Sequence, residues 1–233
     1  MSDVLTVVSY NVRSLRDDRD ALVRVIRAAR PDVLCLQEAP RGPSWRRRRE
    51  ALAHDAGMSV AAGGRVGGVC VLAGPGVRVV RGQGERLRWI PGLEWRALAL
   101  AIVEKEGARF AVGSAHLDLV PRARLRHAAQ IVQILDDAAR TSGAKAVLAV
   151  DVNERPGEPV WTYLADRFTD GHARAPRGEG RTFPARDPAM RIDAIFVDHG
   201  LAVLACGGAE AAARQDLRHA SDHLPVVADV APV

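Results

Sequence analysis

The chain has 233 residues, of which 48% are hydrophobic, and carries a formal net charge of +5 at pH 7. A chain of this length and apolar content can bury one sizeable core, so we expect a single domain over residues 1–233. It has no run of 18 apolar residues and no basic start followed by an apolar stretch, so we expect neither a membrane span nor an export signal.

Cysteine usage and charge give further expectations. Cys35, Cys70 and Cys206 are odd in number, far apart and flanked by apolar residues, which is typical of buried reduced thiols in a cytoplasmic protein. The positive charge favours a polyanionic partner such as nucleic acid, but nearly all basic residues are Arg. A GC-rich genome produces that bias without selection for binding, so charge alone identifies no partner. We expect a monomer.

The first two strands each end on a polar residue. Residues 5–11 are β-branched and apolar and predict a strand that ends at Asn11. Apolar positions at helical spacing follow in residues 20–30, and residues 32–38 predict a second buried strand that ends at Glu38. This β-α-β unit places Asn11 and Glu38 at the same edge of a sheet.

A basic helix and three strands are expected next. Residues 44–54 predict a helix, whose four consecutive arginines at 46–49 we interpret as a solvated face, with a nucleic-acid contact as the alternative. Strands at residues 59–62, 67–73 and 77–81 are separated by glycine turns and are expected to pair consecutively and antiparallel.

The middle of the chain predicts a hairpin, a long helix and a buried strand. Residues 96–103 and 109–116 flank a polar turn, and the second strand ends on His116. An amphipathic helix follows from Pro121 to about Gly143. The next strand is fully apolar and runs directly into Asp151.

The last third mixes loops with short strands. Residues 156–188 are rich in Gly, Pro and Arg and predict a short helix with loops that could shape a substrate cleft. The strand over residues 191–197 contains a charged Asp193, and further strands are expected at residues 201–205 and 224–230.

The chain has two comparable halves. In each half, strands first alternate with helices and then run as hairpins. This pattern predicts an α/β fold, a four-layer α/β/β/α sandwich with two mixed β-sheets face to face and helices outside. A doubly wound parallel sheet is the alternative, but it needs more crossover helices than the pattern contains.

Polar side chains gather at the ends of these strands or within them. A charge in a buried strand is costly unless it has a partner, a metal or a catalytic task. The residues concerned are Asn11, Glu38, His116, Asp151, Asn153, Asp193, Asp222 and His223.

The segments that carry these residues resemble a known motif series. They read Ser-Tyr-Asn, Leu-Gln-Glu, His-Leu-Asp, Asp-Val-Asn-Glu, Arg-Ile-Asp-Ala-Ile-Phe-Val and Ser-Asp-His-Leu-Pro. In order and approximate interval, from residue 5 to 230, they are similar to the endonuclease/exonuclease/phosphatase superfamily, which includes pancreatic-type deoxyribonuclease. The resemblance implies a four-layered α/β sandwich with its site in a cleft between the upper edges of the two sheets.

The resemblance also implies a metal site. Glu38, with Asn11 and with Asp222 as a further candidate, would supply oxygen ligands to Mg²⁺ or Mn²⁺, which would meet the phosphate directly.

The other residues receive roles in hydrolysis from the same resemblance. Asp151 would act as general base or orient the attacking water, and Asn153 would hydrogen-bond the nucleophile or a phosphate oxygen. His116 and His223 would donate hydrogen bonds to the phosphate, stabilising the charge of the transition state. Asp193 would pair with a ring nitrogen of His223 and favour its cation.

Two positions depart from subfamilies of this group. Deoxyribonuclease-like members pair the first catalytic His with a Glu from an earlier strand, and Glu94 is the only nearby candidate here. Abasic-site endonucleases carry Lys two residues after the metal-binding Glu, where this chain has Pro40.

These residues leave three functions open. A metal-dependent phosphodiesterase with nucleic acid as the leading substrate is the favoured prediction. The first alternative is a phosphomonoesterase acting on a small phosphorylated metabolite or a lipid headgroup, although the chain shows no amphipathic membrane-docking segment. The second alternative is a non-catalytic binding module with the same fold, which would leave the full set of acids and histidines without a purpose.

Overall fold

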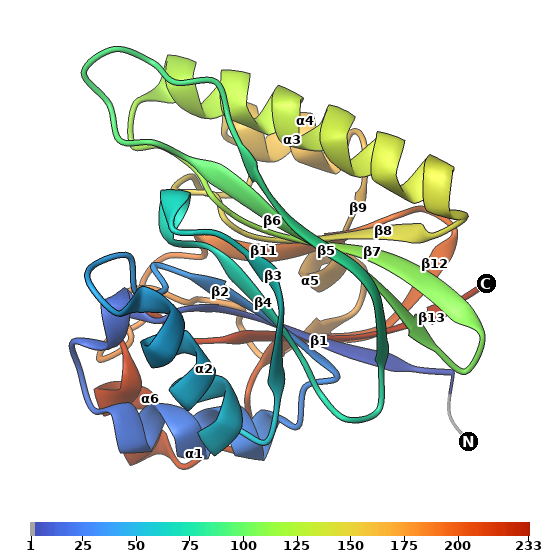
Figure 1. The fold of residues 1–233 in the computed structure, drawn as a ribbon. Helices are drawn as coiled ribbons and strands as arrows, with labels where there is room; N and C mark the ends of the chain where they lie inside the picture. The colour runs from blue at the N-terminus through green and yellow to red at the C-terminus, as the bar shows by residue number, and fades with distance from the viewer. Residues whose placement is uncertain (1–2) are drawn as a thin grey trace.

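Two β-sheets stack face to face in the computed structural model, which describes residues 3–233, and helices cover both outer faces (Figure 1). One sheet has the strand order β10 (Pro176–Arg177), β12 (Leu201–Gly208), β13 (Val226–Pro232), β1 (Leu5–Asn11), β2 (Val33–Gln37), β4 (Cys70–Ala73), β3 (Ser59–Gly63). The other has the order β5 (Arg78–Arg86), β6 (Ala97–Lys105), β7 (Ala108–His116), β8 (Lys145–Asp151), β11 (Asp193–Val197), β9 (Thr169–Asp170).

The helices form the two outer layers. Below the first sheet in Figure 1 lie α1 (Arg19–Ala29), α2 (Trp45–Asp55) and α6 (Arg214–Ala220). Above the second sheet lie α3 (Pro121–Ser142) and α4 (Pro159–Ala165). The remaining helical segments are short: η1 (Arg13–Leu15), η2 (Val66–Gly68) and α5 (Gly171–Arg174). The predicted four-layer sandwich is confirmed. Among the described residues, no helix is both long enough and apolar enough to cross a membrane.

Local signals explain where the main helices begin and end. The Asp18 carboxylate caps α1 by accepting hydrogen bonds from the backbone N–H groups of Asp20 and Ala21. Pro121 occupies the start of α3, where its missing N–H costs nothing, and Gly143 ends that helix with a φ of 60°. The sequence signals for these helices therefore agree with the packing of their apolar faces.

Strand register brings the polar strand ends to one side of the sandwich. Parallel β1 and β2 pair Asn11 with Gln37, which immediately precedes Glu38. In the other sheet, His116 of β7 pairs with Asp151 of β8, and Asp151 pairs in turn with Asp193 of β11. Strands far apart in the sequence thus deliver their polar residues to neighbouring sheet edges.

Two details differ from the expectations. The third of the expected consecutive strands, β5, does not pair with β4; it crosses to the other sheet and pairs with β6, because the turn at residues 74–76 carries the chain between the layers. The arginine run is not entirely solvated either. Arg49 is 1% exposed, with its guanidinium donating to the carbonyl oxygens of Pro40, Gly64 and Val69.

The crossing of β5 over β3 requires a glycine. A Cβ added at Gly82 would lie 1.7 Å from the carbonyl oxygen of Ala61, which is backbone and cannot move aside. We therefore expect Gly82→Ala to lower the free energy of unfolding by about 1–3 kcal/mol through overpacking. Gly208→Ala, where an added Cβ meets no atom within 4 Å, is the control in urea unfolding. Equal stability of the two variants would contradict this prediction.

Candidate active site

Asp151 lies at the centre of the clustered polar residues, at the end of β8, and is 1% exposed. Its Oδ2 accepts a hydrogen bond from Asn11 Nδ2 at 2.9 Å and lies 3.5 Å from His116 Nε2 and 3.9 Å from His223 Nε2. Its Oδ1 accepts from the backbone N–H of Asn153 at 3.1 Å. One carboxylate is therefore held by groups from both sheets, including two histidines.

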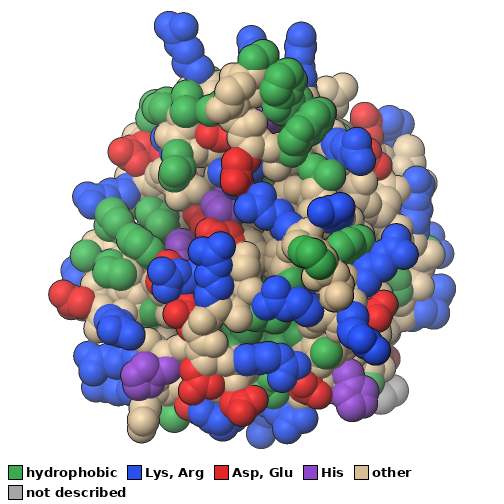
Figure 2. Space-filling model, turned by 60° about the vertical axis from the view of Figure 1, so that its left-hand side comes forward, with side chains coloured by type: hydrophobic (Ala, Val, Ile, Leu, Met, Phe, Trp, Pro, Cys, Tyr) green, Lys and Arg blue, Asp and Glu red, His purple; other side chains and the backbone are tan. Residues whose placement is uncertain are grey.

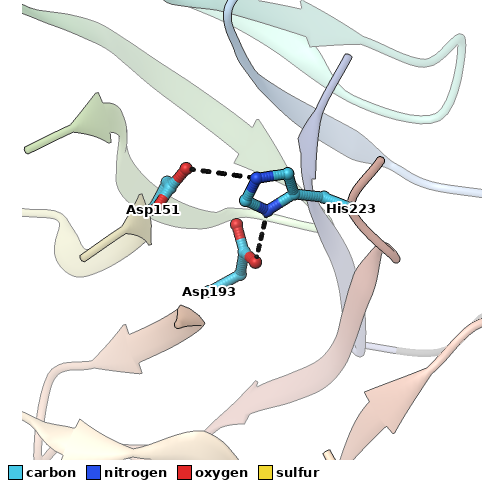
Figure 3. A group of neighbouring side chains, drawn as sticks. All are labelled: Asp151, Asp193 and His223. Carbon is cyan, nitrogen blue, oxygen red and sulfur yellow. Dashed lines mark hydrogen bonds and ion pairs between the residues drawn. The ribbon is translucent and has the colours of Figure 1, made fainter. Parts of the chain in front are cut away.

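A buried ion pair lies behind this carboxylate. His223 Nδ1 is 2.9 Å from Asp193 Oδ2, and Figure 3 shows the imidazole placed between Asp151 and Asp193. Burial alone would lower the pKa of His223, but the charge and hydrogen bond of Asp193, with smaller contributions from Asp151 and Asp222, raise it to about 9. Burial raises the pKa of Asp193, and the His223 cation opposes that rise. The pair therefore holds its proton on His223 at neutral pH.

The second histidine has the opposite character. Burial lowers the pKa of His116, and the positive charge of Arg96 adds to that effect, while Asp151 opposes it. His116 is therefore a neutral imidazole at neutral pH. The two histidines that flank Asp151 thus differ in charge, one neutral and one cationic.

Glu38 and Asn11 form the other side of the site. Glu38 follows β2 with a φ of 49°, and its Oε1 accepts a hydrogen bond from Asn11 Nδ2 at 3.2 Å. The same amide nitrogen also binds Asp151, so a single neutral donor bridges two carboxylates. The carboxylates of Glu38 and Asp151 offer the oxygen ligands that Mg²⁺ and Mn²⁺ prefer, whereas Asn11 faces them through its amide nitrogen and its Oδ1 accepts from the backbone N–H of Arg13 at 3.1 Å. These residues fit a hard divalent cation once the Asn11 amide turns its oxygen toward it.

A second set of potential metal ligands overlaps this one. One ligand atom from each of Asp151, Asp193 and His223 lies within 4.8 Å of the others. A cation held by all three would have to displace the hydrogen bond between His223 and Asp193. The Glu38 side keeps that bond intact and is the better candidate for the cation.

The remaining predicted residues divide between two hollows. Asn153 lines the same cavity as Glu38, His116, Asp151 and His223, and its Nδ2 donates to the carbonyl oxygen of Leu117 at 3.1 Å. Asp222 instead lines a neighbouring hollow. Its Oδ2 is 3.2 Å from Arg13 Nε. The structure therefore places Asp222 next to Arg13, and its role as a ligand of the cation stays a prediction.

Arg96 is a functional candidate that sequence reasoning missed. It lines the cavity, is 8% exposed and lies 3.5 Å from Asp118 Oδ2 through its Nε. Within residues 3–233, Nε has no hydrogen-bond partner of good geometry, so the buried guanidinium retains donor capacity. A charged residue at the start of a strand reads as an ordinary strand boundary, so the sequence carries no distinctive signal for it.

Glu94 does not reach the first histidine. Its side chain is 62% exposed, and its Oε2 pairs with Arg41 at 3.1 Å. The carboxylate beside His116 is that of Asp151.

The cavity containing these groups has a volume of about 600 Å³ and opens to the surface. On the face drawn in Figure 2, acidic and His side chains lie in a central hollow, with Lys and Arg side chains around it. A buried carboxylate, a cationic and a neutral imidazole, and an arginine could together hold a phosphate group and activate a water molecule.

Comparison with known proteins identifies the family of this chain. The model of the endonuclease/exonuclease/phosphatase family matches residues 8–223. Among curated protein sequences, none matches this chain.

Several solved structures share the fold. A mannosyl-6-phosphatase of Bacteroides thetaiotaomicron has a TM-score of 0.81 and 18% identity, over 97% of this chain and 99% of that one. The human Nocturnin catalytic domain has a TM-score of 0.74 and 17% identity, over 100% and 96%. TDP2 of D. rerio, solved with a single-strand DNA product, has a TM-score of 0.72 and 18% identity, over 98% and 99%.

Proposed function

This chain belongs to the endonuclease/exonuclease/phosphatase family, whose members hydrolyse phosphoester bonds, and we propose that it is a phosphodiesterase dependent on a divalent cation. The observation that carries the proposal is the position of Asp151. Its carboxylate lies between the oxygen ligands on the Glu38 side and the two imidazoles, where a water molecule would meet a bound phosphate. Asp151 would take the proton of that water as the water oxygen bonds to phosphorus and the P–O bond to one ester group breaks, so that a phosphomonoester and an alcohol are released.

The other residues would stabilise the phosphate as negative charge builds on it. His223, held cationic by Asp193, and Arg96 would donate to non-bridging oxygens. His116 would donate through one ring N–H while remaining neutral. Asn153 would donate an amide N–H to the phosphate or the nucleophile without adding negative charge.

Glu38 and Asn11 would hold the cation, for which we propose Mg²⁺ or Mn²⁺. When bound, the cation supplies charge neutralisation for the phosphate and its leaving group. Asn11 now donates its amide N–H to both carboxylates, so cation binding would require its oxygen to turn toward the site.

A reducing compartment such as the cytoplasm fits the cysteines. Cys35, Cys70 and Cys206 are free and buried.

A phosphomonoesterase is the second candidate function, because one of the similar folds belongs to a mannosyl-6-phosphatase. A substrate panel separates the two. We expect hydrolysis of bis(4-nitrophenyl) phosphate and of oligonucleotides with Mg²⁺ or Mn²⁺, and little release of phosphate from sugar or inositol phosphates. Phosphate release from monoesters with diesters left intact would overturn the proposal, and no hydrolysis of any phosphoester would favour a binding module.

The His223–Asp193 pair predicts how activity depends on pH. Activity requires the protonated, positively charged form of His223, so wild-type activity should fall as the pH rises through about 9. Asp193→Asn removes the main cause of the raised pKa, so this fall should move to lower pH, toward or below the ordinary value of about 6.5. The pH profile of kcat measures the shift. An unchanged alkaline limb in Asp193→Asn would show that another group controls it.

A further inference from the structure

Two large aromatic side chains lie exposed next to the active-site cavity. Trp89 and Trp95 belong to the loop of residues 87–96, which projects beyond the sheets between β5 and β6 (Figure 1). Their ring centroids are 5.7 Å apart with planes inclined by 21°, so each ring covers one face of the other. The two residues are nevertheless 45% and 47% exposed, which leaves large apolar surface in contact with water.

Hydrogen bonds hold this loop in place. The backbone N–H of Arg88 donates to Gln130 Oε1 at 2.8 Å, and its carbonyl oxygen lies 3.0 Å from His127 Nε2, both on α3. Within the loop, Trp89 Nε1 donates to the carbonyl oxygen of Leu93 at 3.3 Å. The stacked pair is therefore a preformed surface, which reduces the entropy lost when a ligand binds to it.

Arginines surround the same surface. Trp95 lines a hollow together with Arg41, Arg65 and Arg86, and this hollow shares Arg41 and Glu94 with the active-site cavity. Glu94 is already paired with Arg41. Over residues 3–233, Arg65 and Arg86 form no ion pair, although Arg65 Nε donates to the carbonyl oxygen of Arg41. The hollow is therefore a cationic extension of the active site.

We propose that this surface, the Trp–Arg rim (Trp89, Trp95, Arg65 and Arg86), binds an unpaired stretch of nucleic acid on one side of the scissile phosphodiester. The inference rests on the proposed function and adds the substrate class. Unpaired bases offer flat faces that stack on aromatic rings, and their phosphates bind guanidinium groups.

Two other occupants fit the rim less well. A sugar monophosphate carries one anionic group, which the cavity residues His223 and Arg96 would bind, and it leaves Arg65 and Arg86 without a partner. A duplex keeps its base faces stacked inside the helix, where tryptophan rings cannot reach them. The combination of open aromatic faces with unpaired arginines favours a single strand.

Binding without turnover tests the rim directly. Fluorescence anisotropy with a labelled single strand of about 12 nucleotides is measured in EDTA, so that cleavage is not required. We expect Trp95→Ala and Trp89→Ala each to weaken binding about 5- to 100-fold, the loss typical of one stacked base. Leu204→Ala, which removes another exposed apolar side chain from β12, should leave binding unchanged.

The arginines are tested by salt dependence. Arg65→Gln and Arg86→Gln should each reduce the slope of log Kd against log salt by about 0.7, the value for one single-strand phosphate contact. Arg140→Gln, on the exposed face of α3, is the matched control and should not change the slope. Unchanged slopes in Arg65→Gln and Arg86→Gln would remove these two residues from the rim.

Kinetics separate a failure of the rim from a failure of the proposed function. Trp95→Ala should lower kcat/KM for the oligonucleotide by the same factor as its affinity, while kcat/KM for bis(4-nitrophenyl) phosphate stays within about twofold. Three results would overturn the inference. They are equal losses of kcat/KM on both substrates, an affinity for duplex equal to that for the single strand, and Trp-dependent binding of mannose 6-phosphate in place of the single strand. Trp-dependent binding of the single strand without hydrolysis of either diester would instead overturn the proposed function and leave the rim intact.

Discussion

Asp151→Asn is expected to lower kcat for a phosphodiester by about 10²- to 10⁴-fold, the usual contribution of a general base. An amide cannot take the proton of the attacking water, although its oxygen can still accept one of the hydrogen bonds that now come from Asn11 and Asn153. KM should change much less than kcat, because the groups that bind phosphate remain. Steady-state kinetics with an oligonucleotide and with bis(4-nitrophenyl) phosphate measure both constants.

The control for this variant is Asp166→Asn, which makes the same chemical change at an exposed position at the end of α4. The control should keep wild-type kcat. Circular dichroism and the midpoint of urea unfolding should show that Asp151→Asn remains folded. Wild-type activity in folded Asp151→Asn would mean that the measured hydrolysis comes from another protein in the preparation or that Asp151 is not the base.

Glu38→Gln should raise the concentration of Mg²⁺ or Mn²⁺ needed for half-maximal activity by at least about 10- to 100-fold, because loss of a group that only orients a metal ligand already costs that much. The change keeps the size of the side chain but removes the negative charge that would attract the cation. Calorimetric titration with Mn²⁺ alone gives the affinity without reference to activity. High concentrations of the cation should restore part of kcat.

Glu50→Gln on the exposed surface of α2 is the matched control and should leave metal affinity at the wild-type value. Suppose that Glu38→Gln keeps the wild-type Mn²⁺ affinity and Asp193→Asn loses it. The cation would then be assigned to the group formed by Asp151, Asp193 and His223. The assignment of Glu38 would then be wrong.

Much of the arrangement around the site follows from rules that act over short distances in the sequence. Parallel strands joined by a helix end at the same sheet edge, which is why Asn11 and Glu38 could be expected to meet. Asp151 and Asn153 are two residues apart, and the tight turn after β8 brings the Asn153 N–H to the Asp151 carboxylate. The stacking of two sheets followed from the alternation of strands and helices.

Other features depend on tertiary packing that the sequence pattern does not encode. Asp222 and His223 are adjacent, yet their side chains leave the chain in different directions, one toward Arg13 and one toward Asp193. Arg49 stands in a run of arginines that suggests a solvated face, but loops packed over α2 bury it. Arg96 gains its candidate role only because β6 begins at the wall of the cavity.

The most direct test of the account is ³¹P nuclear magnetic resonance of bis(4-nitrophenyl) phosphate incubated with the wild-type protein and Mg²⁺, before and after addition of excess EDTA. We predict conversion of the diester signal to that of the monoester, little further conversion to inorganic phosphate, and arrest of the reaction by EDTA. Hydrolysis that continues at the same rate in EDTA, or a diester signal that persists unchanged with the protein and Mg²⁺, would contradict this prediction.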